Sequence, residues 1–336
     1  MSDPTSSSSQ TFKQQLIADG LIGTPSATLS PLVGGVSSEI YLVTEGSSSF
    51  VVKRALAKLK VKDDWFADTS RNTTECDYIE YVSQFTPRNV PEIIARGDGY
   101  FAMEHLGEGY ENWKRLMLDG HFREHHGMMA GAFLSQIHLR TRGDQTAAKL
   151  FDRSKNFYDL RIEPYIITTG NRHPKLRDHF KAEADRLASF RLCLIHGDFS
   201  PKNILIRENR MVVLDCEVAY FGDPTFDYAF MLSHLLLKAL FVSKQRPNAL
   251  RSVEAFRQSY HEGIALDPAE RKLFSFHAGR LLAMLLLARI DGKSPVEYLQ
   301  DEKSKSFVRE FGYAHLQHEN PTAKKLVDAW FNALLS

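Results

Sequence analysis

The chain has 336 residues, of which 43% are hydrophobic and 25% are charged. This length and composition are ample for a well-buried core and fit two structural units. Lysines and arginines number 42 against 41 acidic residues, which gives a net charge of +1 at pH 7. Composition therefore offers no electrostatic argument for binding nucleic acid or a membrane, and we expect neither as a partner.

The N-terminal segment and the cysteines bear on location. Residues 1–11 contain four consecutive serines and lack the basic region and apolar core of a signal peptide, so we expect a flexible tail there. Cys76, Cys193 and Cys216 fall inside predicted helices or strands and form no C-x-x-C pair. These features are typical of a cytoplasmic protein without disulfides.

Strands are predicted early in the chain and helices later. Residues 12–104 mix strands with a helix, whereas residues 105–336 are mostly helical apart from one hairpin. The apolar stretches 229–242 and 281–290 are shorter than the ~20 residues of a membrane span and are interrupted by charged or polar residues, so they predict buried helices. This order favours an α+β bilobal architecture with a nucleotide-binding N-lobe (12–104), a catalytic C-lobe (105–336) and an active site in the cleft. Helices are expected at 10–19, 128–140, 176–190, 229–242, 252–262, 268–288 and 323–335.

A glycine turn joins the first two predicted strands. Gly34 and Gly35 are followed by Ser37 and Ser38, between Pro31-Leu-Val and Glu-Ile-Tyr-Leu-Val. Glycines let backbone amides approach an anion closely, and serine hydroxyls add donors. The turn could therefore cover nucleotide phosphates, although the full G-x-G-x-x-G is absent and a plain hairpin turn fits equally well.

A short strand that ends in Lys53 follows this turn. Phe50-Val-Val-Lys53 has the pattern of the kinase strand whose lysine binds the α- and β-phosphates. The expected partner is a glutamate on the next helix, where Glu75 and Glu80 are available. Glu75 shares a helix face with the apolar residues three, four and seven positions later, whereas Glu80 points about 140° away. The pattern favours Glu75, while an ordinary solvated glutamate fits either position.

The most informative motif lies near the middle of the chain. His196-Gly-Asp198 is followed by four residues and Asn203, the spacing of the kinase catalytic loop H-R-D-x-x-x-x-N. Apolar runs before and after this loop predict strands, and the polar turn 207–210 predicts a hairpin that carries Asp215 back beside Asn203. Phosphoryl transfer needs an aspartate to orient and deprotonate a hydroxyl, and oxygen ligands for magnesium. All three groups are present in the required order.

This segment resembles the aminoglycoside phosphotransferase and choline kinase superfamily, which has a protein-kinase-like fold and includes methylthioribose kinase. The family loop reads H-G-D-x-x-x-x-N, and its metal aspartate is followed two positions later by a glutamate or similar residue, as Asp215-Cys-Glu217 is. The resemblance implies that Asp198 is the catalytic base, that Asn203 and Asp215 bind Mg²⁺, and that Glu217 lies near metal or substrate. It further implies that His196 braces the loop without taking part in the chemistry.

The fold implied by the resemblance also places a hinge between the two lobes. Phe101-Ala-Met103-Glu104-His-Leu106 occupies that position, where backbone groups would meet adenine. Met103, Glu104 and Leu106 are therefore expected to contact ATP. Asp223 and Asp227 are expected to be structural: Asp223 precedes Pro224 at a helix start, and Asp227 resembles the aspartate that anchors the catalytic loop backbone in kinase-like folds.

The predicted function is transfer of phosphate from ATP to a hydroxyl of a small metabolite or amine. Protein kinases carry D-F-G and a long activation segment, whereas Gly222-Asp223-Pro224 begins the next helix only eight residues past Asp215. A non-catalytic nucleotide-binding scaffold on the same fold is the alternative from another class. The sequence does not identify the acceptor, the preferred nucleotide or the oligomeric state.

Overall fold

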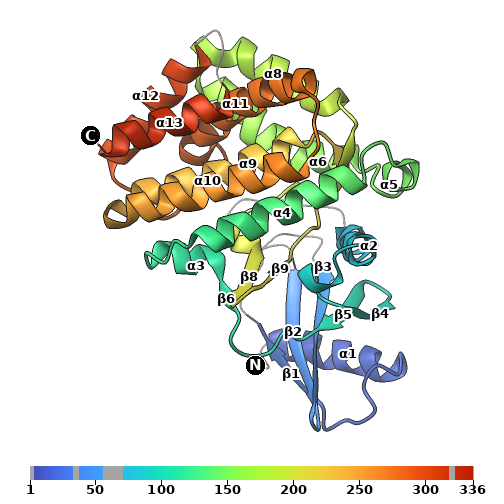
Figure 1. The fold of residues 1–336 in the computed structure, drawn as a ribbon. Coiled ribbons are helices and arrows are strands. Elements are labelled where there is room, and N and C mark those ends of the chain that lie inside the picture. The colour runs from blue at the N-terminus through green and yellow to red at the C-terminus, as the bar shows by residue number, and fades with distance from the viewer. Residues whose placement is uncertain (1–3, 33–37, 56–70, 318–321, 336) are drawn as a thin grey trace. The chain divides into compact units, whose positions relative to one another are not determined.

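The computed structural model describes residues 4–32, 38–55, 71–317 and 322–335. The chain divides into two compact units, which we call unit 1 (Met1–Gly109) and unit 2 (Tyr110–Ser336). The described residues of unit 1 form a sheet, two α-helices and a short 3-10 helix (Pro87–Asn89), and unit 2 is mainly helical (Figure 1). The α+β architecture predicted from the sequence is confirmed, although the chain divides after Gly109 rather than after residue 104.

Unit 1 is built on a five-stranded antiparallel sheet with the strand order β1-β2-β3-β5-β4. Strands β2 and β3 form a long hairpin, paired from Ser38 opposite Ala55 to Glu45 opposite Ser48. The strand that carries Lys53 therefore has β2 on one side and β5 on the other. The strands are β1 (Thr28–Pro31), β2 (Ser38–Glu45), β3 (Ser48–Ala55), β4 (Ile93–Gly97) and β5 (Tyr100–Glu104).

Two helices accompany this sheet, α1 (Pro4–Ala18) and α2 (Arg71–Ser83). Phe12 and Leu16 of α1 are buried in one hydrophobic cluster with residues of β2, β3 and β5. Tyr100 of β5 adds a polar link, because its hydroxyl donates to a carboxylate oxygen of Asp19 at 2.7 Å. Residues 4–11 are thus helical where the sequence predicted a flexible tail.

Unit 2 contains eleven α-helices among its described residues, together with two small sheets. Strand β7 (Cys193–Ile195) pairs with β10 (Tyr220–Gly222), and β8 (Ile204–Arg207) pairs with β6 (Glu111–Asn112) and β9 (Arg210–Val213). A π-helix spans Tyr158–Ile167. The α-helices are α3 (Trp113–Leu118), α4 (Glu124–Arg140), α5 (Gln145–Leu150), α6 (Ser154–Phe157), α7 (Thr168–Arg172), α8 (Arg177–Ser189), α9 (Thr225–Phe241), α10 (Arg246–Gly263), α11 (Pro268–Asp291), α12 (Glu302–Leu316) and α13 (Ala323–Leu335).

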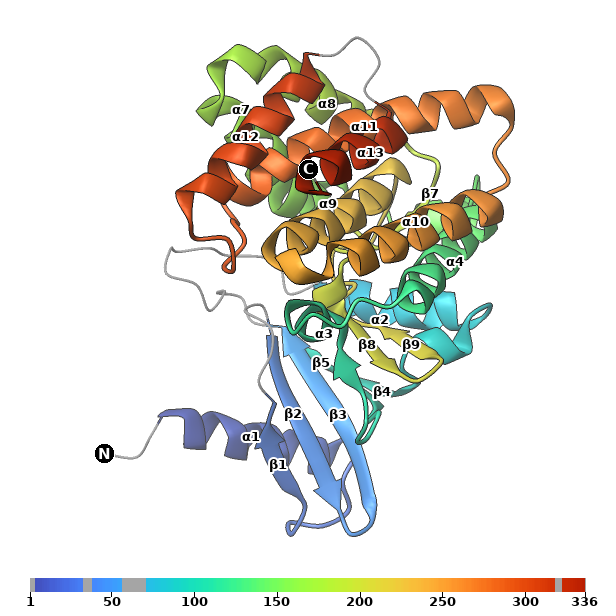
Figure 2. The same ribbon diagram turned by 60° about the vertical axis from the view of Figure 1, so that its left-hand side comes forward.

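Helices α9 and α11 form the centre of unit 2, and α10, α12 and α13 lie around them (Figure 2). By length and composition alone, α11 could cross a membrane, but 72% of its most apolar window is buried inside the protein. Nearly every residue of α9 is also buried. These are the two segments that the sequence predicted to be buried helices, and their burial is typical of core helices.

Helices α4 and α10 lie side by side (Figure 1). Two glycines of α4 face the backbone of α10 at this contact. A Cβ atom on Gly127 would lie 2.0 Å from the carbonyl oxygen of Ser252, and one on Gly131 would lie 2.3 Å from the carbonyl oxygen of Phe256. Both positions therefore need glycine for packing rather than for backbone conformation.

We predict that Gly131→Ala destabilises the protein. Alanine in a helix is normally about 1 kcal/mol more favourable than glycine, but the clash with α10 forces a shift that costs about 1–3 kcal/mol. Urea denaturation followed by circular dichroism measures the change. Ala132→Ser, at an exposed position of the same helix, is the control and should change the free energy of unfolding by less than about 0.5 kcal/mol. Equal stabilities for the two variants would contradict close packing of α4 on α10.

Candidate active site

The predicted catalytic loop connects β7 to β8 and contains a short 3-10 turn at Pro201–Asn203. The strands on either side lie where the sequence predicted them, because short apolar runs separated by turn residues have a strong local preference for strand. The pairing of β7 with β10 was not predicted. It brings the segment after Asp215 directly alongside the strand that enters the loop.

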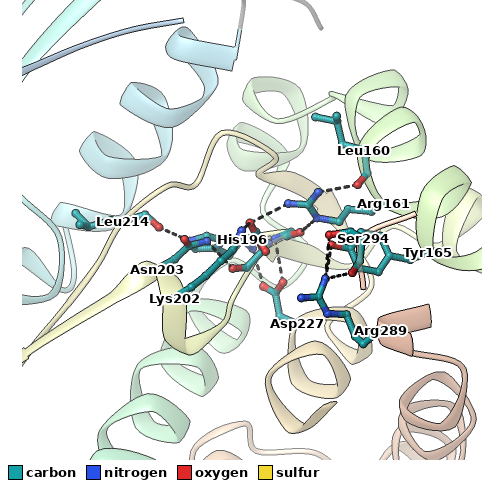
Figure 3. Close-up of polar contacts among 12 residues, drawn as sticks. Leu160, Arg161, Tyr165, His196, Lys202, Asn203, Leu214, Asp227, Arg289 and Ser294 are labelled. Carbon is teal, nitrogen blue, oxygen red and sulfur yellow. Dashed lines mark hydrogen bonds and ion pairs between the residues drawn. The ribbon is translucent and has the colours of Figure 1, made fainter. Parts of the chain in front are cut away.

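A buried carboxylate holds the backbone of this loop. Asp227, in the first turn of α9, is fully buried. Its two carboxylate oxygens accept the backbone N–H of His196 at 2.6 Å and that of Gly197 at 2.9 Å (Figure 3). Charge-assisted hydrogen bonds of this kind are stronger than neutral ones. The predicted anchoring role of Asp227 is confirmed.

Gly197 is required at the centre of the loop for two reasons. Its φ angle is +75°, a conformation that L side chains rarely adopt. A Cβ atom at this position would also lie 2.4 Å from the carbonyl oxygen of Val218. The glycine that replaces the arginine of the protein-kinase motif is therefore imposed by the close approach of the β10 segment.

His196 braces the loop from within. Its Nδ1 accepts the backbone N–H of Asp198 at 3.1 Å, so its Nε2 carries the proton and donates to the carbonyl oxygen of Leu214, also at 3.1 Å. Burial lowers the pKa of His196, and nearby carboxylates only partly offset it. The neutral imidazole therefore links the loop to the end of β9, in agreement with the structural role inferred for it.

Asp198 lies at the centre of a buried charge cluster. Only 5% of its surface is exposed, and one carboxylate oxygen lies 2.8 Å from Lys202 Nζ and 3.1 Å from a terminal nitrogen of Arg161. Burial by itself would raise the pKa of Asp198, but Lys202 and Arg161 outweigh burial and hold this pKa below its ordinary value. Asp198 is therefore ionised at neutral pH and oriented by two cations.

Arg161 was missed by sequence reasoning. It belongs to the π-helix, and its guanidinium donates to the carbonyl oxygens of Leu160, at 2.6 Å, and Gly197, in addition to pairing with Asp198 (Figure 3). No motif surrounds it, because its partner is brought near only by the tertiary fold. The sequence did contain an indication for Lys202, because it lies four residues after Asp198, a spacing at which two side chains can meet when the chain turns.

The predicted metal ligands are brought together by the β8–β9 hairpin. The backbone N–H of Leu214 donates to the carbonyl oxygen of Asn203 at 2.8 Å, so Asp215 follows directly beside Asn203. The side-chain nitrogen of Asn203 donates to the carbonyl oxygen of Asp198 at 3.0 Å, which leaves its amide oxygen as the atom able to bind a cation. Asp215 has a φ angle of +62°, which bends the chain at this point.

This donor set fits a magnesium ion. Mg²⁺ prefers oxygen ligands and is usually held by one or two protein groups together with phosphate oxygens and water. An amide oxygen and a carboxylate meet that description. Glu217 is partly exposed. Burial lowers the pKa of Arg161, but nearby negative charges, including those of Asp198 and Glu217, outweigh burial and raise this pKa. Its predicted contact with metal or substrate remains a prediction.

Unit 1 contains the predicted lysine–glutamate pair. Lys53 Nζ lies 2.6 Å from Glu75 Oε2, and both side chains are buried. Glu80 pairs instead with Arg96 at 2.7 Å, so the choice of Glu75 over Glu80 is confirmed. The side-chain nitrogen of Asn72 donates to the carbonyl oxygen of Lys53 at 3.1 Å, which ties α2 to β3 at this residue.

The other predicted nucleotide contacts are partly described. Gly34, Gly35 and Ser37 lie outside the described residues, whereas Ser38 is buried at the start of β2. Met103 and Glu104 end β5, and Leu106 follows. The backbone N–H of Glu104 donates to the carbonyl oxygen of Glu92 at 2.8 Å, so this group is already used within unit 1. Nucleotide binding by Met103, Glu104 and Leu106 stays a prediction.

Comparison with known proteins places this geometry in a family. A model described as "Phosphotransferase enzyme family" matches residues 28–274. The chain is 25% identical to a methylthioribose kinase of Bacillus velezensis over 58% of this chain and 57% of that protein. It is 23% identical to a methylthioribose kinase of Erwinia tasmaniensis, with coverages of 68% and 66%, and 24% identical to a hydroxylysine kinase of Bos taurus, with coverages of 52% and 49%. The chain thus spans about half to two thirds of the length of these relatives.

Solved structures support the same fold at low identity. An amicoumacin kinase in complex with AMP-PNP, Ca²⁺ and its ligand matches with a TM-score of 0.58 and 13% identity, over 97% of this chain and 96% of that one. A choline/ethanolamine kinase family protein from Mesorhizobium loti matches with a TM-score of 0.55 and 14% identity, over 96% and 99%. These neighbours confirm the protein-kinase-like fold. Because the family model covers well over half of the chain, the chain belongs to the phosphotransferase enzyme family.

Proposed function

We propose that the protein is an ATP- and Mg²⁺-dependent kinase that phosphorylates a hydroxyl group of a small molecule. The observation that carries this proposal is the loop itself: an ionised Asp198 on a backbone fixed by Asp227, with Asn203 and Asp215 beside it on one hairpin. Relatives with kinase names and a structural neighbour bound to AMP-PNP support the same chemistry.

In the proposed mechanism, Asp198 accepts a hydrogen bond from the acceptor hydroxyl and takes its proton as the hydroxyl oxygen bonds to the terminal phosphorus. The bond from that phosphorus to the bridging oxygen breaks, and ADP leaves. Positioned acid–base groups contribute about 10²- to 10⁴-fold. The lowered pKa makes Asp198 a weak base, so its larger role is to orient the hydroxyl.

Charge neutralisation is divided among several side chains. Asn203 and Asp215 would hold Mg²⁺, which when bound supplies positive charge to the phosphate oxygens. Lys202 lies 2.8 Å from Asp198, where its ammonium can also neutralise charge that develops on the transferred group. For the Lys53–Glu75 pair we keep the predicted role of binding the α- and β-phosphates.

A small acceptor is favoured over a protein. After Asp215 the chain enters β10 within five residues and α9 within ten, and β10 is paired to β7. This segment is therefore committed to the sheet beneath the catalytic loop. Protein kinases use a long segment at this position to dock a peptide. Here residues 216–224 form only β10 and the short connections on either side of it.

We predict that Asp198→Asn retains ATP binding and loses turnover by about 10²- to 10⁴-fold. Asparagine keeps the shape but cannot accept the proton. ADP release with a library of hydroxylated metabolites measures turnover, and calorimetry measures ATP affinity. Asp178→Asn, at an exposed position of α8, is the control and should behave as wild type. Full turnover in Asp198→Asn would remove the assignment of the base, whereas nucleotide binding without any turnover in the wild type would favour the scaffold alternative.

Asp215→Ala should weaken binding of magnesium–ATP by about 10- to 100-fold, because one charged ligand of the metal is lost. Calorimetric titration with ATP in the presence of Mg²⁺ measures this loss. The same titration in EDTA is the control, and there the variant and wild type should agree. An equal loss with and without Mg²⁺ would show that Asp215 acts through the fold and does not bind the metal.

Lys202→Met should move the acidic limb of the pH profile of kcat/KM to higher pH. Lys202 and Arg161 together hold the pKa of Asp198 below its ordinary value, so removing one cation raises that pKa. Asp198 then becomes protonated, and inactive, at a higher pH than in wild type. Lys175→Met, at an exposed position, should leave the profile in place. A limb that stays fixed in Lys202→Met would mean that Asp198 does not control it.

A further inference from the structure

Unit 2 contains a second group of charged and polar side chains that the proposed mechanism does not use. We call it the cationic cluster, and it comes from three helices and the segment after α11. Arg289 of α11 is 8% exposed, and Lys238 and His234 of α9 are 0% and 4% exposed. Tyr165 of the π-helix and Tyr298 complete the cluster.

The two basic residues of the cluster have no acidic partner. Arg289 donates to the hydroxyl of Tyr165 at 3.3 Å and to the hydroxyl of Ser294 at 3.1 Å. Lys238 Nζ lies 3.4 Å from His234 Nδ1 and 5.2 Å from the centroid of the Tyr298 ring. Among the described residues, neither Arg289 nor Lys238 forms an ion pair with a carboxylate.

The carboxylates on neighbouring elements are already engaged. Glu297 pairs with Lys114, and Glu163 pairs with Lys293 at 2.7 Å. Asp198 pairs with Lys202 and Arg161. Burial lowers the pKa of Lys238 well below its ordinary value, and the charges of Arg289 and Lys114 lower it further. The charge of Glu297 offsets part of this effect on Lys238. Arg289 therefore provides the positive charge of the cluster, and no carboxylate of the described residues pairs with it.

Several polar atoms of the cluster are buried without a hydrogen-bond partner. These atoms are His234 Nε2, Arg289 Nε and the hydroxyl of Tyr298. Buried polar groups are normally paired in native proteins, and an exception calls for a specific explanation. All three atoms can donate a hydrogen bond, and a group that accepts hydrogen bonds and carries negative charge would satisfy them and pair with Arg289.

The cluster adjoins the catalytic aspartate through Tyr165. The guanidinium carbons of Arg161 and Arg289 each lie 5.8 Å from the centroid of the Tyr165 ring, so the two guanidinium groups are at most twice that distance apart. Arg161 in turn pairs with Asp198, and Figure 3 shows Arg161, Tyr165 and Arg289 close together. A short molecule can therefore reach from Arg289 to Asp198.

We infer that the phosphate acceptor carries an anionic group, a carboxylate or a phosphate ester, which Arg289 binds while the acceptor hydroxyl reaches Asp198. This inference rests on the proposed kinase function and names its substrate class. Arginine suits the role because its planar donors match the geometry of carboxylates and phosphates. Burial and neighbouring cations lower the pKa of Lys238 and of His234 well below their ordinary values, and an anion bound at Arg289 would favour the protonated, hydrogen-bond-donating form of each. Polyamines and quaternary ammonium compounds would meet repulsion here.

The test uses acceptors that share a carbon skeleton and differ in charge. Glycerate, glycerol phosphate and glycerol form one set, and gluconate, glucose phosphate and glucose form a second; ethanolamine and choline represent cationic acceptors. Turnover is followed by ADP release with magnesium–ATP, and binding by calorimetry on Asp198→Asn loaded with nucleotide. We expect an anionic member to bind and react at least tenfold better than its neutral counterpart. The carboxylate and phosphate arms show which anion is preferred.

Variants of Arg289 connect this preference to the cluster. Arg289→Met should raise KM for the preferred anionic acceptor by about 10- to 100-fold, with a smaller change in kcat, because one charge-assisted contact is lost. Arg289→Lys should recover part of the loss because it keeps the charge. Arg280→Met, on the same helix, is the control and should leave KM unchanged. Circular dichroism establishes whether each variant folds. If Arg289→Met does not fold, Lys238→Met replaces it, with an expected rise in KM smaller than that predicted for Arg289→Met.

The outcomes separate the two proposals. Two measurements test the kinase function without any acceptor: nucleotide binding, which Asp198→Asn should retain, and slow ATP hydrolysis in water, which Asp198→Asn should lose. If these fail, the proposed function fails. If they succeed, the kinase function stands and the acceptor tests decide the inference. The inference of an anionic acceptor is wrong if turnover occurs only with neutral or cationic acceptors, if no anionic probe binds, or if Arg289→Met leaves KM for the anionic acceptor unchanged.

Discussion

The active site depends on one buried carboxylate, that of Asp227, which accepts two consecutive backbone N–H groups of the catalytic loop. Those two bonds fix the loop at Gly197, where only glycine fits, and so aim the next residue, Asp198. Asp227 belongs to α9, a helix that is almost entirely buried in unit 2, so these hydrogen bonds attach the loop to the packed core. Preorganised groups held on rigid elements are what efficient catalysis requires.

Charge balance is the second constraint on this site. An ionised carboxylate that is nearly fully buried is unfavourable unless opposite charges and hydrogen bonds compensate for lost hydration. For Asp198 that compensation comes from Lys202 and Arg161, which reach it from the loop and from the π-helix. The two cations keep Asp198 deprotonated and also reduce its basicity. Asp198 is therefore better suited to holding a hydroxyl in line than to removing its proton early.

Local patterns in the sequence predicted the loop, the β8–β9 hairpin and the Lys53–Glu75 pair, because each depends on spacing or helix periodicity over a few residues. Arg161 could not be predicted in this way, since only the tertiary fold brings it to Asp198. The same reason applies to the pairing of β7 with β10 and to the contact of Tyr165 with Arg289. The helical start at Pro4 was missed because a serine run suggests disorder, whereas burial of Phe12 and Leu16 favours a helix.

Helix α9 connects the catalytic loop to the cationic cluster. Asp227, His234 and Lys238 are separated by intervals that return to nearly the same face at about 100° per residue, so they form one stripe along the helix. The stripe from Asp227 to Lys238 is about 16 Å long at 1.5 Å per residue. Stability alone would favour apolar residues at such buried positions. Helix α9 thus carries both the carboxylate that aims Asp198 and two of the buried polar side chains grouped with Arg289, so one rigid core element supports both groups.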